Sequence, residues 1–366
     1  MCECYSSPIN CILPPEMVKN IKVKGGKKER RWAEELEVEA DRYRSLRSRS
    51  IPTSAFKPVP KVKDGDKGSK IREVYDVQQP NSFRKEGDPK CGNPDVDAAF
   101  EFAGAVYDFF FDQFRRDSLD GKGFKMVARV NYRIHPKKPY PNAQWDLTDK
   151  EMKYGEGCLK KDKERYGEGY GIYNSFSRDL SISAHEHAHG IIQFSGGLEY
   201  HSQAGALNES IADVFASMVV QYAGKKNVHE ASWLIGENVF HKQNRNYVSG
   251  MALRSLKAPG QAYDHKVMGK DIQPFHMDAY DPDRGPHVNS GIPNHAFYLL
   301  AIQLGGYSWE KAGRIWYNSL EKADNPLIRF DEWANLTVQE AIGLFGSESE
   351  EALLTRRAWK LVGLNI

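Results

Sequence analysis

The spacing of apolar residues along the chain predicts a protein made mostly of helices, with strands in its first half. Apolar residues recur every three to four positions, as on one face of a helix, in four segments: 29–47, 95–114, 180–194 and 207–222. Residues 71–77 and 125–132 have the length and alternation of strands. The chain after residue 222 has a mostly helical pattern.

The polar segments divide the chain. Residues 50–70 contain three prolines and two glycines, the composition of an exposed linker, so we expect a boundary there. Residues 19–31 carry seven basic residues and one acid, which indicates a solvated or processing-exposed segment. Residues 254–286 are rich in Pro, Gly, Asp and His, and an irregular stretch of that length in a compact domain is often functional.

Composition excludes several classes of protein. At ~150 residues per domain, 366 residues suggest two lobes and a smaller segment, and 40% hydrophobic residues are enough for a folded core. The net charge of +2 gives no general attraction for nucleic acid or an anionic membrane. No apolar stretch approaches the ~18 residues that a membrane span needs. The five scattered cysteines indicate reduced thiols rather than a disulfide framework.

The amino terminus is acidic early and lacks the apolar stretch of a secretory signal peptide. We therefore expect cytoplasmic synthesis, with the protein remaining there or being secreted without a classical signal peptide.

The strongest chemical motif lies on the predicted helix 180–194. His185-Glu186-His187-Ala188-His189 contains His-Glu-x-x-His, which places two histidines four positions apart on one helix face. A random chain of this composition would show about 0.02 such matches. The alternative is a pair of surface histidines on an ordinary helix.

Two carboxylates on the next predicted helix extend this motif. Glu209 and Asp213 lie one turn apart and off the apolar stripe, so in an isolated helix they would form a solvated face. Antiparallel packing of the two helices would instead bring Glu209 beside the histidines. Two His and one Glu form a zinc set that leaves one position for water. Asp213 would then accept the second ring N–H of a ligand histidine, which orients the ring.

Four further stretches carry a family resemblance. They are Asn142–Trp145, Gly205–Asp213, Ala252–Ser255 and His287–Ile292. With the zinc motif, and in this order, they resemble the signature blocks of the thermolysin family of zinc neutral metalloproteases, over residues 72–363. The resemblance implies an α+β, two-lobed fold with a mostly β amino-terminal lobe and a mostly α carboxyl-terminal lobe. The zinc-binding helix would lie at the base of the cleft between them.

The resemblance also implies roles at the metal. His185, His189 and Glu209 would bind one zinc ion, and Glu186 would be the general base that takes a proton from the attacking water. His287 and Tyr200 would donate hydrogen bonds to the carbonyl oxygen as it gains charge.

Further positions correspond to substrate-binding groups of the family. Asn142 and the backbone of Ala143 would align an extended substrate on an edge strand, and Arg254 would hold a substrate carbonyl beyond the cleaved bond. On spacing alone, a solvent-facing arginine is the alternative for Arg254. The resemblance, with Leu253 next to Arg254, predicts cleavage before bulky apolar residues.

Some positions depart from the family pattern. An acidic residue is expected five positions before His287, but Pro282 stands there, with Asp281 and Asp283 on either side. Which of these two acids, if either, supports His287 is therefore open. Ser181 and Val220 stand where two calcium-binding carboxylates are expected, so calcium binding is open too.

The front of the chain is similar to the protealysin branch, which has a short precursor with a Pro-Pro element like that in residues 12–17. We therefore expect a propeptide over 1–55, a linker and maturation region over 56–70, an amino-terminal catalytic lobe over 71–195 and a helical lobe over 196–366. The propeptide would inhibit the enzyme sterically through Pro14-Pro15 or through a thiolate of Cys4 or Cys11 on the metal. Self-cleavage is expected before Leu46 or Phe56.

Two alternatives to a protease follow from the same residues. One is a catalytically inactive binding protein that retains the zinc fold, with a fourth protein ligand closing the metal site. The other is a metallohydrolase for a non-peptide ester or amide, without the substrate strand. The protease hypothesis predicts protein or peptide substrates and the protein's own propeptide as partners.

Overall fold

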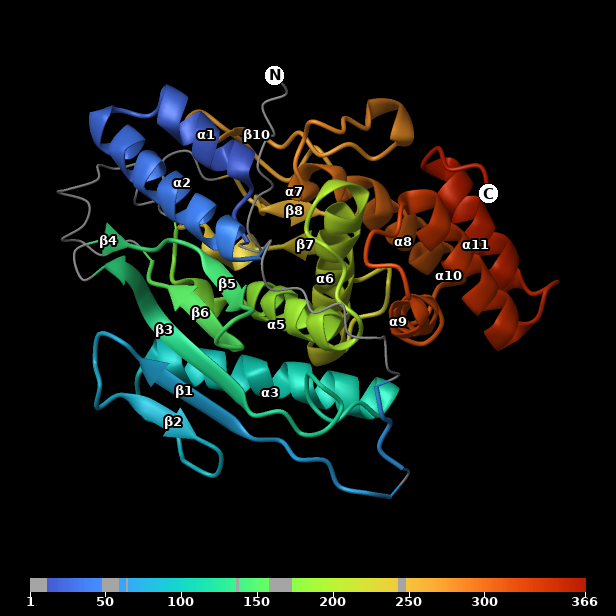
Figure 1. Ribbon diagram of the computed structural model, residues 1–366, viewed down its shortest axis with the longest axis horizontal. Helices are drawn as coiled ribbons and strands as arrows, with labels where there is room; N and C mark the ends of the chain where they lie inside the picture. Colours follow the sequence, from blue (N-terminus) through green and yellow to red (C-terminus); the bar gives the residue numbers. More distant parts are fainter. Residues whose placement is uncertain (1–11, 48–58, 64, 136–137, 158–172, 243–247) are drawn as a thin grey trace.

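The protein is described from a computed structural model. The structure describes residues 12–47, 59–63, 65–135, 138–157, 173–242 and 248–366. A strand-rich lobe and a helical lobe meet at two central helices, and a pair of amino-terminal helices lies over the junction (Figure 1).

The helices of the described residues are α1 Pro15–Lys24, α2 Lys27–Arg47, α3 Pro94–Phe114, α5 Leu180–Phe194, α6 Ser202–Ala223, α7 Pro286–Asn289, α8 Gly291–Leu304, α9 Ala312–Lys322, α10 Phe330–Phe345 and α11 Glu350–Leu361. Short 3₁₀ turns are η2 Phe176–Arg178, η3 Glu237–Val239 and η4 Met277–Ala279. The predicted helix 180–194 is confirmed at both ends. The predicted helix 207–222 begins earlier, at Ser202, because its first turn is too polar and small to show an apolar stripe.

The strands of the larger sheet are β1 Arg72–Asp76, β2 Phe83–Lys85, β3 Met126–His135, β4 Lys138–Pro139, β5 Ala143–Asp146 and β6 Glu151–Gly155. They are ordered β2-β1-β3-β6-β5, with β4 paired to β3. β1, β3 and β6 are parallel, whereas β5 runs antiparallel to β6 at the edge. An edge strand keeps one row of backbone groups available for another chain.

The rest of the fold places this edge beside the two central helices. α3 packs against β1 and β3, while α5 packs against both β5 and α6. Helices α7 and α8 contact α6, and α10 and α11 pack beyond them. Short strands in the irregular region after α6 are β7 Leu234–Ile235, β8 Arg254–Ser255, β9 Asp264–His265 and β10 Gly269–Lys270. The two lobes expected from the sequence are therefore present.

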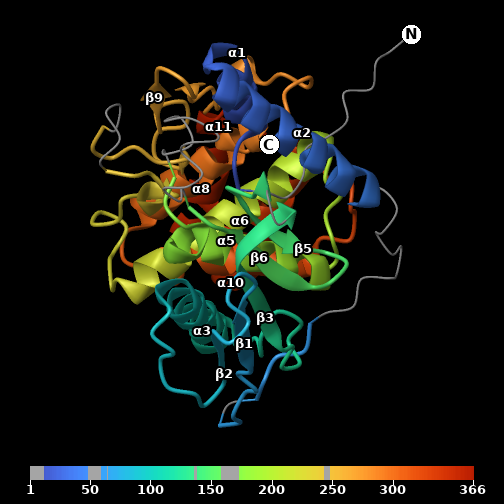
Figure 2. The same ribbon diagram turned by 90° about the vertical axis from the view of Figure 1, so that its left-hand side faces the viewer.

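The amino-terminal helices α1 and α2 form a hairpin that packs on the rest of the chain (Figure 2). Ile12, Leu13, Met17 and Trp32 are buried. Helix α1 was not predicted from the sequence. Its apolar face is short, and three lysines interrupt the apolar pattern. No helix in the described parts of the chain is long and apolar enough to cross a membrane.

Candidate metal and peptide-binding site

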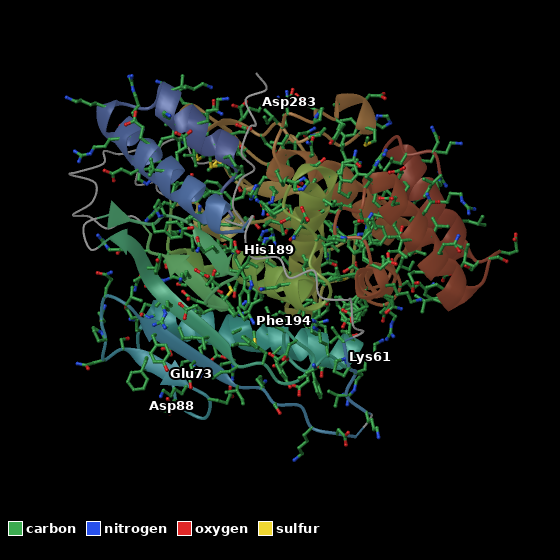
Figure 3. The ribbon with its side chains drawn as sticks, viewed as in Figure 1. Lys61, Glu73, Asp88, His189, Phe194 and Asp283 are labelled. Atoms are coloured by element: carbon green, nitrogen blue, oxygen red, sulfur yellow. The ribbon has the colours of Figure 1, made fainter. Side chains whose placement is uncertain are left out.

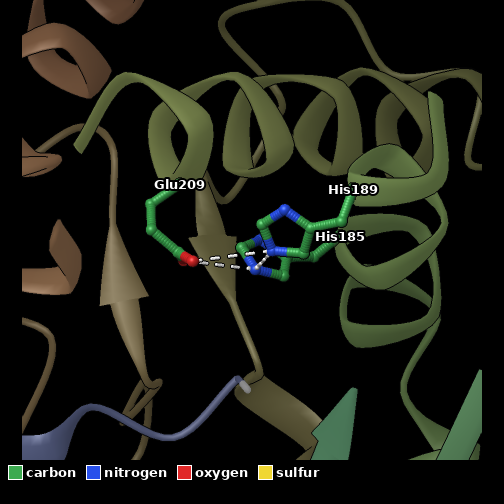
Figure 4. A group of neighbouring side chains, drawn as sticks. All are labelled: His185, His189 and Glu209. Atoms are coloured by element: carbon green, nitrogen blue, oxygen red, sulfur yellow. Dashed lines mark hydrogen bonds and ion pairs between the residues drawn. The ribbon is translucent and has the colours of Figure 1, made fainter. Parts of the chain in front are cut away.

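Three side chains from α5 and α6 converge on one point (Figure 4). The Nε2 atoms of His185 and His189 lie 3.0 Å apart, and the Glu209 carboxylate oxygens lie 3.4 Å from His185 Nε2 and 3.5 Å from His189 Nε2. All three side chains are buried. His189 lies near the centre of the view in Figure 3. Antiparallel packing of the two helices thus brings Glu209 to the histidines, as expected.

Local sequence explains why the helices hold these positions. Asp179 caps α5, because its side chain accepts hydrogen bonds from the amides of Ser181 and Ile182. On α6, Gly205 lets α7 approach closely: a Cβ there would lie 2.8 Å from Pro286 Cγ. Since α7 carries His287, this contact brings a further functional candidate to Glu209.

The geometry of the three side chains fits zinc. Zinc–nitrogen bonds of ~2.0–2.1 Å at tetrahedral angles place neighbouring ligand atoms ~3.4 Å apart. The observed separations are 3.0–3.5 Å. Two neutral imidazoles and a carboxylate are also the donor set of catalytic zinc sites. Among the described residues, these three form the one group of His, Cys, Asp or Glu side chains suited to a metal ion.

The other ring nitrogen of each histidine is held in place. Asp213 Oδ1 lies 2.8 Å from His185 Nδ1, and Asn208 Oδ1 lies 2.8 Å from His189 Nδ1. Asp213 also accepts two hydrogen bonds from Arg254 and one from Asn294. Burial would raise the pKa of Asp213, but Arg254 and His185 hold it below its ordinary value. Asp213 therefore stays ionised and orients the His185 ring.

Asn208 and Asn294 are functional candidates that the sequence reasoning missed. Asn208 directly precedes Glu209 in the block used for the resemblance, which is the signal that could have identified it. Asn294 lies on α8, and its contact with Asp213 depends on packing between distant segments.

Glu186 lies on α5 between His185 and His189 in the sequence and faces the edge strand. Its Oε2 accepts a hydrogen bond from the Trp145 amide at 2.8 Å. Its Oε1 is buried and has no hydrogen-bond partner among the described residues. Burial raises the pKa of Glu186 to about 8, although the neighbouring His185 opposes this shift. A buried carboxylate with one free oxygen is suited to exchange protons with a water or a ligand.

Tyr200 and His287 both lie at the carboxylate of Glu209. The Tyr200 hydroxyl donates a hydrogen bond to Glu209 Oε1, and His287 Nε2 lies 3.4 Å from Glu209 Oε2. Which acid supports His287 stays an open question, and the surroundings of the two candidates differ. Asp281 forms an ion pair with Arg284, and Asp283 is exposed.

The edge of β5 carries a stretch of the amino-terminal segment. Ile12 N donates to the Ala143 carbonyl at 3.2 Å, and Leu13 N donates to Asn142 Oδ1 at 3.1 Å. The Ile12 carbonyl accepts a hydrogen bond from Arg254 Nη1 at 2.8 Å. Arg254 is fully buried, so the solvent-facing alternative for this residue is wrong. The three predicted substrate-binding residues thus contact two consecutive residues of the same chain.

Ser181 and Val220 stand at the two positions where calcium-binding carboxylates were expected, and their surroundings differ. The Ser181 side chain bonds to Asp179 and accepts a hydrogen bond from the Gly236 amide at 2.8 Å, while Asp179 also accepts from the Asn238 amide at 2.8 Å. Val220 offers no ligand atom in its side chain. Hydrogen bonds from backbone amides to the Ser181 hydroxyl and the Asp179 carboxylate therefore tie the start of α5 to residues 236–238.

Comparisons with known proteins agree with this geometry. Residues 60–193 match the thermolysin metallopeptidase catalytic domain, and residues 196–364 match the thermolysin metallopeptidase alpha-helical domain. The chain is 42% identical over 309 residues to Protease PrtS of a Photorhabdus strain, covering 81% of this chain and 76% of that protein. It is 37% identical over 368 residues to an extracellular metalloprotease of Pectobacterium carotovorum, covering 99% of this chain and 98% of the relative.

A solved structure extends the similarity to the amino-terminal segment. The precursor of protealysin from Serratia proteamaculans superposes with a TM-score of 0.77 at 36% identity, covering 97% of this chain and 99% of that one. The matched region includes most of residues 1–55, so the similarity is to a precursor and not only to catalytic lobes. The chain therefore belongs to the thermolysin family of zinc-dependent endopeptidases, as a protealysin-like member.

Proposed function

We propose that His185, His189 and Glu209 bind the one catalytic zinc ion of this endopeptidase. Support comes from the 3.0–3.5 Å separations of their ligand atoms, which match the edges of a tetrahedral zinc site. Zinc in such a site activates water and polarises a peptide carbonyl. Asp213 and Asn208 keep the two rings turned toward the metal position.

Glu186 acts as the general base. Its buried Oε1 has no hydrogen-bond partner among the described residues, so it is available to a water molecule at the metal position. It takes a proton from the attacking water and passes it to the leaving amine.

Tyr200 and His287 stabilise the carbonyl oxygen as negative charge develops on it. Both lie at Glu209, so a carbonyl oxygen at the metal would meet their donors.

Substrate binds as an added strand along the edge of β5. The observation that carries this proposal is the seating of Ile12 and Leu13, whose backbone groups contact Ala143, Asn142 and Arg254. Leu13 contacts the residue before Ala143, so the segment runs antiparallel to β5. The Ile12 amide is then the group nearest Trp145, whose own amide binds Glu186.

This register supports cleavage before bulky apolar residues. Ile12 would occupy the position directly after the cleaved bond, and its side chain is fully buried. Ile12 also belongs to the main cluster of buried apolar side chains, as a bulky apolar residue at that position would.

The same contacts support an inhibitory propeptide over residues 1–55, because Ile12 and Leu13 fill the positions that a substrate needs. A linker and maturation region over 56–70 would separate it from the lobes 71–195 and 196–366. Cys4 and Cys11 lie outside the described residues, so their ligation of the metal stays a prediction. Calcium is not needed for the hydrogen bonds that join Asp179 and Ser181 to the 236–238 loop.

Two relatives are named as extracellular proteases, those of Pectobacterium carotovorum and Serratia marcescens. We propose that this enzyme is either exported without a classical signal peptide or acts in the cytoplasm, with protein or peptide substrates and no nucleic-acid partner.

Digestion of casein by the matured protein, followed by mass spectrometry of the fragments, tests the function and its specificity together. We expect most cuts before Leu, Ile, Phe, Val and Met. Cuts mostly before Asp or Lys would contradict the pocket assignment. Intact casein would favour the inactive binding protein.

A further inference from the structure

The floor beneath α1 and α2 contains a hydroxyl group that the catalytic chemistry does not use. Tyr173 is fully buried, and its hydroxyl donates to Met17 Sδ at 3.0 Å and to Met268 Sδ at 3.5 Å. The ring of Trp32 on α2 lies 6.3 Å from the Tyr173 ring, centroid to centroid. Two side chains of the amino-terminal segment therefore cover Tyr173.

We call this floor the α1 platform and define it by Tyr173, Met268 and Gly269. Gly269 belongs to the platform because Asn20 of α1 lies directly over it: a Cβ on Gly269 would be 2.4 Å from Asn20 Nδ2. The glycine also has a φ of +82°, which other residues adopt at a cost. The absence of a side chain at this point lets α1 lie close to the backbone of residue 269.

The α1 platform is continuous with the peptide-binding edge. The chain that contacts β5 at Ile12 and Leu13 turns at Pro14 and enters α1 at Pro15. Met17, five positions after Ile12, then reaches the Tyr173 hydroxyl. One continuous segment thus occupies both the substrate-binding edge and the platform.

Removal of residues 1–55 would expose this platform beside the cleft. It would present an apolar floor with one hydroxyl donor, which suits a long, polarisable, apolar side chain such as Met. A charged side chain there would lose its hydration without gaining a partner from the platform.

We propose that the α1 platform is a second substrate-binding site of the matured enzyme. It takes an apolar side chain of about the size of Met, carried by a polypeptide that leaves the cleft as a helix. That side chain lies five positions after the residue that follows the cleaved bond. This inference rests on the proposed release of the propeptide and on Ile12 marking the first position after the cleaved bond.

Four synthetic substrates test the proposal. Each begins with a fluorescent acyl group on glycine, and the parent continues with residues 12–24 of this chain. The second substrate has Ala in place of Met17, the third has Ala in place of Val23, and the fourth ends after Leu13. Val23 is 68% exposed on α1, so its replacement removes a similar amount of apolar surface without touching the platform.

Release of the acyl-glycine product by the matured enzyme gives kcat/KM for each peptide. We expect the parent to exceed the Met17→Ala peptide by about tenfold, the effect of burying one such side chain. The Val23→Ala peptide should match the parent. Because Ala favours a helix more than Met does, helix propensity cannot produce this preference.

Enzyme variants assign the preference to the platform. In Met268→Ala the ratio of parent to Met17→Ala peptide should fall close to one, and in Tyr173→Phe, which keeps the ring, it should fall part of the way. The ratio is measured within one enzyme preparation, so a loss of overall activity does not affect it.

The outcomes separate this inference from the proposed function. Equal rates for the parent and the Met17→Ala peptide, with the short peptide cleaved, would overturn the platform and leave the protease assignment intact. An unchanged ratio in both enzyme variants would do the same. Failure to cleave the short peptide after glycine would instead contradict the proposed cleavage register.

Discussion

At the scale of single residues, Asp213 links the metal position to the peptide-binding edge. Its carboxylate lies 2.8 Å from His185 Nδ1 and accepts two hydrogen bonds from Arg254, whose Nη1 donates to the Ile12 carbonyl. Arg254 is buried, and its ion pair with Asp213 raises the pKa of the guanidinium further above its ordinary value. One buried carboxylate therefore contacts both a proposed zinc ligand and a proposed substrate-binding arginine.

Glu186 gives the sharpest prediction at this scale. Glu186→Gln keeps the size of the side chain and an acceptor for the Trp145 amide but cannot take a proton. We expect zinc content and thermal stability to stay at the level of the unmodified protein, while kcat falls at least ~10²-fold. Activity on a short peptide, measured beside metal content after the unmodified protein has removed residues 1–55 from the variant, checks this.

A metal-ligand variant provides the contrast. His189→Ala should lose zinc as well as activity, since metal binding and folding are coupled. Glu186→Gln with activity close to the unmodified enzyme would remove Glu186 from the role of base.

At the scale of elements, the peptide-binding edge depends on a glycine at the end of β6. Gly155 N donates to the Asn142 carbonyl at 2.7 Å, and a Cβ on Gly155 would lie 1.3 Å from the Tyr140 carbonyl oxygen. Gly155 does not have a positive φ, so its constraint is steric crowding against the 140–142 loop. That loop positions Asn142, whose side-chain oxygen accepts a hydrogen bond from the Leu13 amide.

Gly155→Ala should therefore displace the edge without disturbing the metal ligands on α5 and α6. We expect KM for peptides to rise about tenfold or more, since misplacement of a binding group by 1 Å can cost up to ~10²-fold. Zinc content should not change. Steady-state kinetics and metal analysis of the purified variant provide both readouts.

Gly343→Ala is the matched control. Gly343 lies in α10 with no atom within 4 Å of the added methyl group, so this variant should keep KM and gain a little stability. A normal KM in Gly155→Ala would show that the edge does not depend on this contact.

The elements also show which features a sequence reveals. Helix α5 was predicted because the zinc motif and the apolar period coincide, and the contact of Glu209 followed from helix packing alone. Helix α1 was missed because its buried face is only Met17, Val18 and Ile21, and part of its partner surface, such as Tyr173, lies more than 150 positions later. Local periodicity does not contain such a distant contact.

At the scale of the whole molecule, the sheet edge, the central helices and the amino-terminal segment meet at the proposed ligand set. Ile12 and Leu13 of that segment lie along the edge that the proposed substrate would use. The proposed function therefore predicts that removal of the segment precedes activity toward other chains. The Asp213 network could be predicted in part, through His185. The contacts of Asp213 with Arg254 and Asn294 needed the tertiary structure, because they join β8 and α8 to α6.

Maturation is predicted to be self-catalysed. Leu46 lies in the last turn of α2, so a cut before it needs local unwinding, whereas Phe56 lies outside the described residues. Amino-terminal sequencing of the matured protein should give a start at one of these two residues. A purified Glu186→Gln chain should remain at full length, and its maturation alone at normal speed would exclude self-cleavage.

The most direct test of the account is cleavage of casein by the matured protein before and after removal of metal. A chelator should abolish cleavage by the matured protein, and an equimolar addition of zinc should restore it. Cleavage that persists when metal analysis finds no zinc would contradict the assignment of His185, His189 and Glu209 as the catalytic metal site.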